Sequence, residues 1–102
     1  MQPTYYSPKI FLPPHEVTHP QKVIALANSM WQYGWRGPSL VAYRLPDNTG
    51  FQLLSGTHRQ AAAIELNRMI PVVILPWDVV EAAWGTDRWR DIMMAGHDAI
   101  VS

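Results

Sequence analysis

Apolar residues along the chain form two kinds of pattern, one with helical spacing and one of short continuous runs. Helical spacing extends from Pro20 to Tyr33, where Gly34 predicts the end of a helix. An alanine-rich segment from His58 to about Asn67 predicts a second helix. Short apolar runs predict strands at residues 9–12, 40–43, 51–54 and 71–75. This order favours an α/β or α+β fold, with helices packed on a small mixed β-sheet.

The tail over residues 76–102 has a weaker pattern. Its spacing predicts one or two short helices, with Thr86 as a cap of the second. Trp77, Trp84 and Trp89 place much apolar surface in this tail. Two interpretations stand: the tail covers the open side of the core, or its tryptophans contact a protein partner or a second copy of the chain.

Length and composition restrict the class of protein. The 102 residues suffice for one domain, 1–102, and 48% hydrophobic residues with 16% charged ones exclude a disordered chain. Eight basic residues balance eight acidic ones, which does not favour DNA binding. The absence of cysteine removes disulfides and thiolate chemistry. Without a signal-peptide pattern or a long apolar run, we expect a cytoplasmic protein that makes no membrane contact.

The segment 51–66 carries the most specific chemistry. A strand enters a tight turn at Gly56, and a helix leaves it with His58 and Arg59 in its first turn. Free N–H groups and the dipole at a helix start favour an anion, and a bound anion would explain basic residues there. Gly56 lets the backbone approach a ligand, and Thr57 can cap the helix or donate its hydroxyl. An ordinary capped helix with two solvated polar residues is the alternative.

The sequence around this turn resembles the ParB/sulfiredoxin superfamily. Its members carry G-E-R-R, G-C-H-R or D-G-H-x-R where this chain has Ser55-Gly56-Thr57-His58-Arg59, and the order of helix, Gly34, Pro38 and strands is similar over about residues 10–75. In that family the turn holds the phosphates of ATP or CTP. The resemblance implies a ParB/sulfiredoxin-like fold that binds ATP or CTP with Mg²⁺. The implied phosphate-binding residues are Ser55, Gly56, Thr57, His58, Arg59 and, in a loop facing the nucleotide, Arg36.

The segment His15–His19 matches the H-E-x-x-H motif of zinc metalloproteases. That motif binds zinc only when one continuous helix carries both histidines. Pro13 and Pro14 precede the segment and Pro20 follows it, and a residue before proline is displaced from helical dihedral angles. We therefore predict no zinc and no other protein-bound metal.

The same residues fit the family resemblance better. Leu12-Pro13-Pro14-His15-Glu16 resembles the L-x-P-H-E stretch of ParB-like proteins of the free-serine-kinase type, in which the glutamate acts as a base. The resemblance implies Glu16 as a catalytic base toward a hydroxyl, and places His58 beside it as a second catalytic candidate. A solvated loop carboxylate is the alternative for Glu16.

The sequence departs from the family pattern at three points. Thr57 replaces the cysteine that sulfiredoxins need, which excludes sulfinic acid repair. The Glu-Arg-Arg turn and the helix-turn-helix domain of chromosome-partitioning ParB are absent, and Ser55 replaces an aspartate of the serine kinases. Three functions stay open: a nucleotide-binding domain with NTPase or phosphotransferase activity, a non-catalytic protein-interaction module, and a small DNA nuclease or DNA-binding protein. The neutral charge and the lack of clustered carboxylates count against the third.

Overall fold

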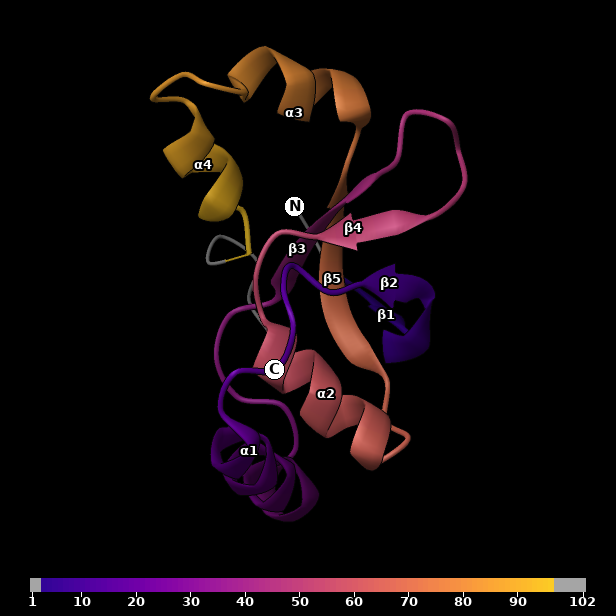
Figure 1. The fold of residues 1–102 in the computed structure, drawn as a ribbon, viewed down its shortest axis with the longest axis vertical. Helices are drawn as coiled ribbons and strands as arrows, with labels where there is room; N and C mark the ends of the chain where they lie inside the picture. The colour runs from indigo at the N-terminus through magenta and orange to yellow at the C-terminus, as the bar shows by residue number, and fades with distance from the viewer. Residues whose placement is uncertain (1–2, 97–102) are drawn as a thin grey trace.

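The fold is built on a single five-stranded β-sheet with helices on both faces (Figure 1). It is described here from a computed structural model that covers residues 3–96. The elements in chain order are β1 (Thr4–Tyr6), the 3₁₀ turn η1 (Pro8–Ile10), β2 (Phe11–Leu12), α1 (Pro20–Tyr33), β3 (Leu40–Arg44), β4 (Phe51–Leu53), α2 (Thr57–Glu65), β5 (Ile70–Leu75), α3 (Trp77–Ala83) and α4 (Trp89–Met93). The predicted α+β class, a small mixed sheet with packed helices, is confirmed.

The sheet is mixed, with the strand order β1-β5-β3-β4-β2. Strand β3 runs parallel to β5 and antiparallel to β4, while β2 runs parallel to β4 and β1 antiparallel to β5. The central strands β3 and β5 are buried on both faces, which explains their continuous apolar runs. Their side chains alternate between the two faces, so that Leu40 and Ala42 enter one core and Val41 enters the other.

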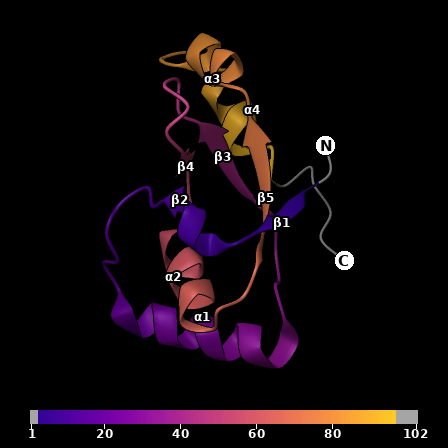
Figure 2. The ribbon, with the colours of Figure 1, turned by 90° about the vertical axis from the view of Figure 1, so that its right-hand side faces the viewer.

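Helices α1 and α2 cover the first face of the sheet. Ala62 and Ala63 on α2 are fully buried against strand residues such as Val72, and their small side chains let α2 lie close to the sheet. In both views of the ribbon, α2 lies between α1 and the strands (Figure 2). Helix α1 therefore reaches the core mainly through α2, with Met30 as its one fully buried residue.

Helices α3 and α4 cover the second face. Val80, Ala83 and Ile92 pack there against strand residues such as Val41 and Val73. The half-buried rings of Trp77 and Trp89 pack against this cluster, whereas Trp84 is 63% exposed. The described part of the tail thus covers the open side of the core, the first of the two interpretations; residues 97–102 of the tail lie outside the described residues.

The N-terminal part differs from its prediction. The expected strand over residues 9–12 is wrong in its first half, because Pro8 and the Ser7 hydroxyl, which accepts a bond from the Lys9 N–H at 3.4 Å, begin the 3₁₀ turn instead. Strand β1 was not predicted at all. It is a three-residue edge strand whose pairing partner, Ile70–Val72, is far along the chain, so no local pattern marks it.

Helix α1 has its predicted bounds, whereas α2 ends at Glu65, two residues before its predicted end. The backbone at Asn67 is left-handed, with φ of 51°, which is incompatible with a continuing helix. Within residues 3–96, no helix is both long and apolar enough to cross a membrane.

Candidate functional site

The turn between β4 and α2 is shaped by Gly56. Its φ of 92° lies in the left-handed region, and a Cβ atom placed on it would lie 2.5 Å from Cδ2 of Leu40 in the core. Glycine is therefore required here both by the turn and by contact with β3. The sequence predicts the tight turn, whereas the contact with Leu40 depends on the packing of β3.

The start of α2 is open. The first intrahelical bond runs from the Gln60 N–H to the Gly56 carbonyl at 2.8 Å, so the N–H groups of residues 57–59 precede the helical ladder. No side chain caps the helix. Gly56 occupies the cap position and Thr57 is the first helical residue, so the expectation that Thr57 caps the helix is wrong. Ser55 is exposed beside this turn.

The hydroxyl of Thr57 is buried without a hydrogen-bond partner. Thr57 is 3% exposed, and within residues 3–96 no atom forms a hydrogen bond with its Oγ1. A buried hydroxyl left unpaired costs about 1–3 kcal/mol. Thr57 is also one of the residues that line a cavity of about 380 Å³.

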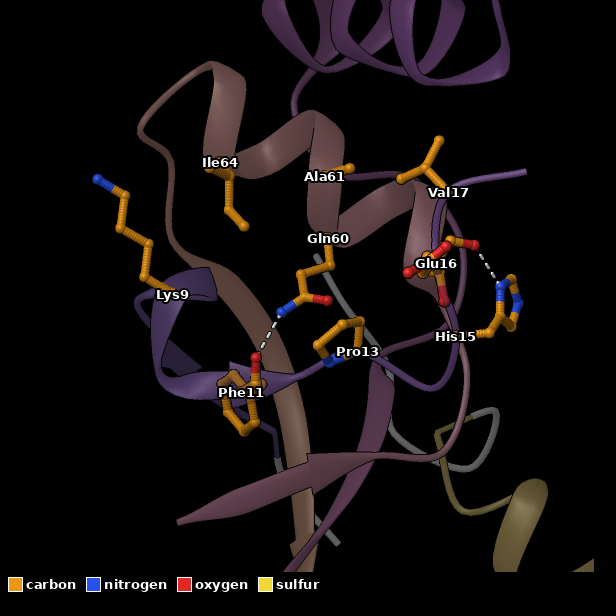
Figure 3. A pocket seen from close by; sticks show the side chains of 10 residues that line it. Lys9, Phe11, Pro13, His15, Glu16, Val17, Gln60, Ala61 and Ile64 are labelled. Atoms are coloured by element: carbon orange, nitrogen blue, oxygen red, sulfur yellow. Dashed lines mark hydrogen bonds between the residues drawn. The ribbon is translucent and has the colours of Figure 1, made fainter. Parts of the chain in front are cut away.

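The cavity lies between α2, β2 and the loop over residues 13–19 (Figure 3). Its walls are mostly apolar, formed by Phe11, Pro13, Val17, Ala61 and Ile64. Lys9 and Glu16 lie on opposite sides of it. The Gln60 amide nitrogen donates to the carbonyls of Pro8 and Phe11 at 3.0 and 2.8 Å and so ties β2 to α2 beneath the cavity.

The loop over residues 13–19 brings Glu16 to the cavity that Thr57 lines. The segment His15–His19 is not helical, as its prolines predict, since α1 begins only at Pro20. His15 Nδ1 lies 2.7 Å from the Glu16 carbonyl oxygen, which fixes the start of this loop locally. Among the residues that the structure describes, no three His, Cys, Asp or Glu side chains are grouped to hold a metal ion.

His58 faces the loop. Its Nε2 lies 3.2 Å from the His19 backbone nitrogen, which donates its N–H, and 3.4 Å from the Thr18 hydroxyl. The rings of His15 and His19 are centred 6.0 and 5.8 Å from that of His58. Loss of hydration, and then the positive charges of Lys22, His19 and His15, hold the pKa of His58 below its ordinary value.

The two candidate arginines both stack on aromatic rings. The Arg59 guanidinium lies 5.4 Å from the centre of the Trp35 ring, and a Cβ atom on Gly37 would lie 3.1 Å from one of its nitrogens. Arg59 thus points toward the loop after α1. Arg36 is exposed on that loop, with its guanidinium 4.2 Å from the centre of the Tyr33 ring.

The structure therefore brings together Glu16, Gly56 and Thr57, while His58 and Arg59 leave the same turn toward different loops. Sequence reasoning missed Gln60, whose signal was a lone polar residue one turn after Thr57 on a face otherwise made of alanine. It also missed Gly37, which has a φ of 97° and lies against the Arg59 guanidinium. No local sequence pattern marks either property.

Comparisons with known proteins find similarity in structure. No family model matches the chain. No curated protein matches it. Sulfiredoxin from Arabidopsis thaliana superposes with a TM-score of 0.63 at 19% identity, covering 80% of this chain and 96% of that one. A free serine kinase in complex with AMP superposes with a TM-score of 0.62 at 21% sequence identity, and the match covers 72% of this chain and 31% of the kinase.

Chromosome-partitioning ParB from Caulobacter crescentus, C-terminally truncated and complexed with CTP-γ-S, gives a TM-score of 0.63 at 15% identity. That match covers 96% of this chain and 66% of the ParB chain. The chain thus spans about a third of the kinase's length and nearly all of the sulfiredoxin. The curled mixed sheet and its helices give this chain a ParB/sulfiredoxin-like fold.

Proposed function

We propose that the chain binds a nucleoside triphosphate, ATP or CTP, at the turn between β4 and α2. The N–H groups of residues 57–59 and the Thr57 hydroxyl would receive the phosphate oxygens. One observation carries this proposal: an uncapped helix start stands next to a buried hydroxyl that has no partner. Phosphate would satisfy both at once.

The fold supports the proposal. Among proteins with this fold, the serine kinase is complexed with AMP and ParB with CTP-γ-S. Purine and pyrimidine nucleotides are both bound on this scaffold, which makes ATP and CTP both candidates here. Identities of 21% or less do not carry over individual residues, so the site in this chain rests on its own geometry.

The basic residues around the turn would complete the site. Arg59 is half-buried and carries the last of the open N–H groups. Ser55 is exposed just before the turn, and Arg36 is exposed on the loop after α1. Mg²⁺ would neutralise phosphate charge. Glu16 is the one acidic residue lining the cavity, so the ion would be held mainly by phosphate oxygens and water.

The cavity beside Thr57 suits an acceptor for phosphoryl transfer. An alcohol there would lose its proton to the Glu16 carboxylate while its oxygen bonds to the γ-phosphorus. The bond from that phosphorus to the bridging oxygen breaks, and the nucleoside diphosphate leaves with the electron pair. Water in the same place would give NTP hydrolysis. The apolar walls favour an acceptor with a small apolar body.

A protein-interaction module is the second candidate. Trp84 is 63% exposed and packs edge-on against Trp89, with the ring centres 5.1 Å apart. Trp77 and Trp89 are half-buried against the second core, so Trp84 would present most of the contact surface to a partner or a second copy.

The proposal is tested by calorimetric titration with ATP, CTP and GTP, each with and without Mg²⁺. We expect wild type to bind at least one of them, and Arg59→Ala to bind it about 10- to 100-fold more weakly, because a hydrogen bond to a charged group is lost. Arg90→Ala, exposed on α4 over the opposite face, should bind like wild type. If wild type binds no nucleotide at millimolar concentration, the proposal fails and the interaction module takes its place.

A further inference from the structure

Three histidines and a lysine meet at the entrance of the loop that carries Glu16. His15 and His19 belong to this loop, His58 to the first turn of α2 and Lys22 to α1. The His58 ring lies near both of the other rings, with their centres 6.0 and 5.8 Å from its own. The sequence predicts His58 beside the phosphates, and in the structure its side chain bonds to the loop over residues 13–19.

The direction of that bond fixes the state of His58. A backbone N–H can only donate, so the Nε2 atom that meets the His19 N–H at 3.2 Å must be an acceptor. An accepting Nε2 carries no proton, and the neutral ring then has its proton on Nδ1. A protonated imidazole donates from both nitrogens and cannot accept this bond.

The bond joins two parts of the proposed site. Within residues 3–96, the hydrogen bonds between the segment 14–19 and α2 are those of the His58 Nε2 atom, which accepts the His19 N–H and lies 3.4 Å from the Thr18 hydroxyl. Glu16 is exposed in the middle of this segment, and its hydrogen-bonded neighbour, His15, belongs to the same segment. The place of the Glu16 carboxylate relative to Thr57 therefore depends on the His58 contact.

The groups that face His58 all oppose its protonation. They are Lys22 from α1 and His15 and His19 from the loop, each cationic or able to become so. No carboxylate is among the groups that shift its titration. Protonation of His58 at Nε2 breaks the bond from the His19 N–H and adds a positive charge between α2 and the loop. Both effects favour separation of the loop from the start of α2.

We infer that neutral His58 is a positioning residue that fastens the segment 14–19, and with it Glu16, to the start of α2, and that protonation of His58 releases this segment. The contact itself is independent of any ligand. Its consequence for catalysis rests on the proposed function: acid would lower kcat by displacing Glu16 while leaving nucleotide affinity undiminished, since the added charge is positive.

The test is a ¹⁵N NMR titration of the whole chain between pH 8 and pH 5, without nucleotide. We expect the His58 ring to carry its proton on Nδ1 at high pH. The His19 amide should shift with the same midpoint as the His58 ring, and its hydrogen-exchange protection should fall roughly fivefold as the bond is lost. An Nε2-protonated neutral ring, or a His19 amide that ignores the His58 midpoint, would overturn the inference.

Two variants separate His58 from the neighbouring rings. His19→Ala removes that residue's own ring but keeps the backbone N–H, so the residue-19 amide should still follow His58. His58→Gln offers a carbonyl acceptor that does not titrate, so the amide should lose this transition and the segment should stay fastened at pH 5. Persistence of the transition in His58→Gln would refute the role of His58. All these readouts precede nucleotide binding, so a failure of the proposed function would leave them intact.

Discussion

At the turn between β4 and α2, two adjacent residues serve the fold and the proposed site together. Gly56 provides a left-handed turn and gives room to Leu40, so the packing of β3 fixes where the open helix start lies. Thr57 has its hydroxyl buried without a partner at the edge of the cavity. One residue therefore sets the position of the site, and the next carries an unsatisfied group that a ligand can pair.

Substitution of Gly56 will destabilise the fold. In Gly56→Ala the new methyl group is strained at φ of 92° and collides with Leu40. We expect a loss of about 2–4 kcal/mol in unfolding free energy, measured by urea denaturation. Gly85→Ala is the matched control, because its φ of 74° imposes similar backbone strain with no atom within 4 Å of the new Cβ. Equal losses in both variants would contradict the contact with Leu40.

Substitution of Glu16 tests its assignment as the base. If the chain turns over nucleotide, Glu16→Gln should lower kcat by roughly 10²–10⁴-fold, because the amide keeps the shape but accepts no proton. Nucleotide affinity should stay near wild type. Glu81→Gln, exposed on α3, is the control. Wild-type turnover by Glu16→Gln would remove Glu16 from the mechanism.

The lowered pKa of His58 predicts a pH dependence of stability. Because the folded pKa lies below the unfolded value of about 6.5, the unfolded chain binds this proton more readily. The stabilisation by neutral His58 is complete above about pH 6.5 and is lost as pH falls through the folded pKa. Urea midpoints measured at pH 7.5 and pH 5 should therefore differ more for wild type than for His58→Gln. A larger decrease of the urea midpoint at pH 5 in His58→Gln than in wild type would contradict a lowered pKa of His58 in the folded state.

At the scale of elements, α2 connects the core to the proposed site. Its alanine face packs on the sheet, its start forms the turn, and Gln60 reaches across to hold η1 and β2. The cavity lies between these elements and the loop over residues 13–19. The shape of the site therefore depends on how firmly α2 holds the short strand β2.

The Gln60 amide is expected to be a main part of that attachment. Gln60→Ala leaves the carbonyls of Pro8 and Phe11 without this donor and opens a gap in the buried face of α2. We expect a loss of about 2–4 kcal/mol in unfolding free energy, with faster hydrogen exchange in β2. Gln32→Ala, exposed on α1, should change stability by less than about 0.5 kcal/mol. Equal stability of the two variants would disprove the role of Gln60.

In the whole molecule, the sheet separates two cores, each with its own pair of helices. The first pair supplies the proposed site, and the second pair covers the opposite face with half-buried Trp77 and Trp89. Both cores include residues of β3 and β5, so the described helices pack around one sheet. Most of the large apolar surface in the described part of the tail thus stabilises the fold, and Trp84 remains 63% exposed.

The elements that could be predicted carry local signals. Pro20 and Gly34 predict the two ends of α1, because proline suits the first turn of a helix and glycine suits the position directly after its last residue. The structure has the helix ends at these positions. Strand β1 could not be predicted, because β5, with which it pairs, lies more than 60 residues further along the chain. The β4–α2 turn was predicted because Gly56 and the alanines at 61–63 lie close together in the sequence and mark a turn followed by a helix.

Side-chain directions at the site could not be predicted. The contacts of His58 with His19 and of Arg59 with Trp35 and Gly37 depend on where two distant loops pass the start of α2. The sequence predicts His58 and Arg59 beside an anion site only because they directly follow the turn at Gly56. Burial of the Thr57 hydroxyl is also a property of the assembled fold, which no local sequence pattern marks.

The most direct test of the account compares wild type with Thr57→Val by nucleotide calorimetry and thermal unfolding in the same buffer. Valine keeps the shape and removes the unpaired hydroxyl, so we predict a higher Tm without ligand, because a buried unsatisfied group costs about 1–3 kcal/mol. Nucleotide affinity should fall by roughly 2- to 10-fold, as one neutral hydrogen bond is lost. A variant that gains stability and binds nucleotide as tightly as wild type would contradict a phosphate contact at Thr57.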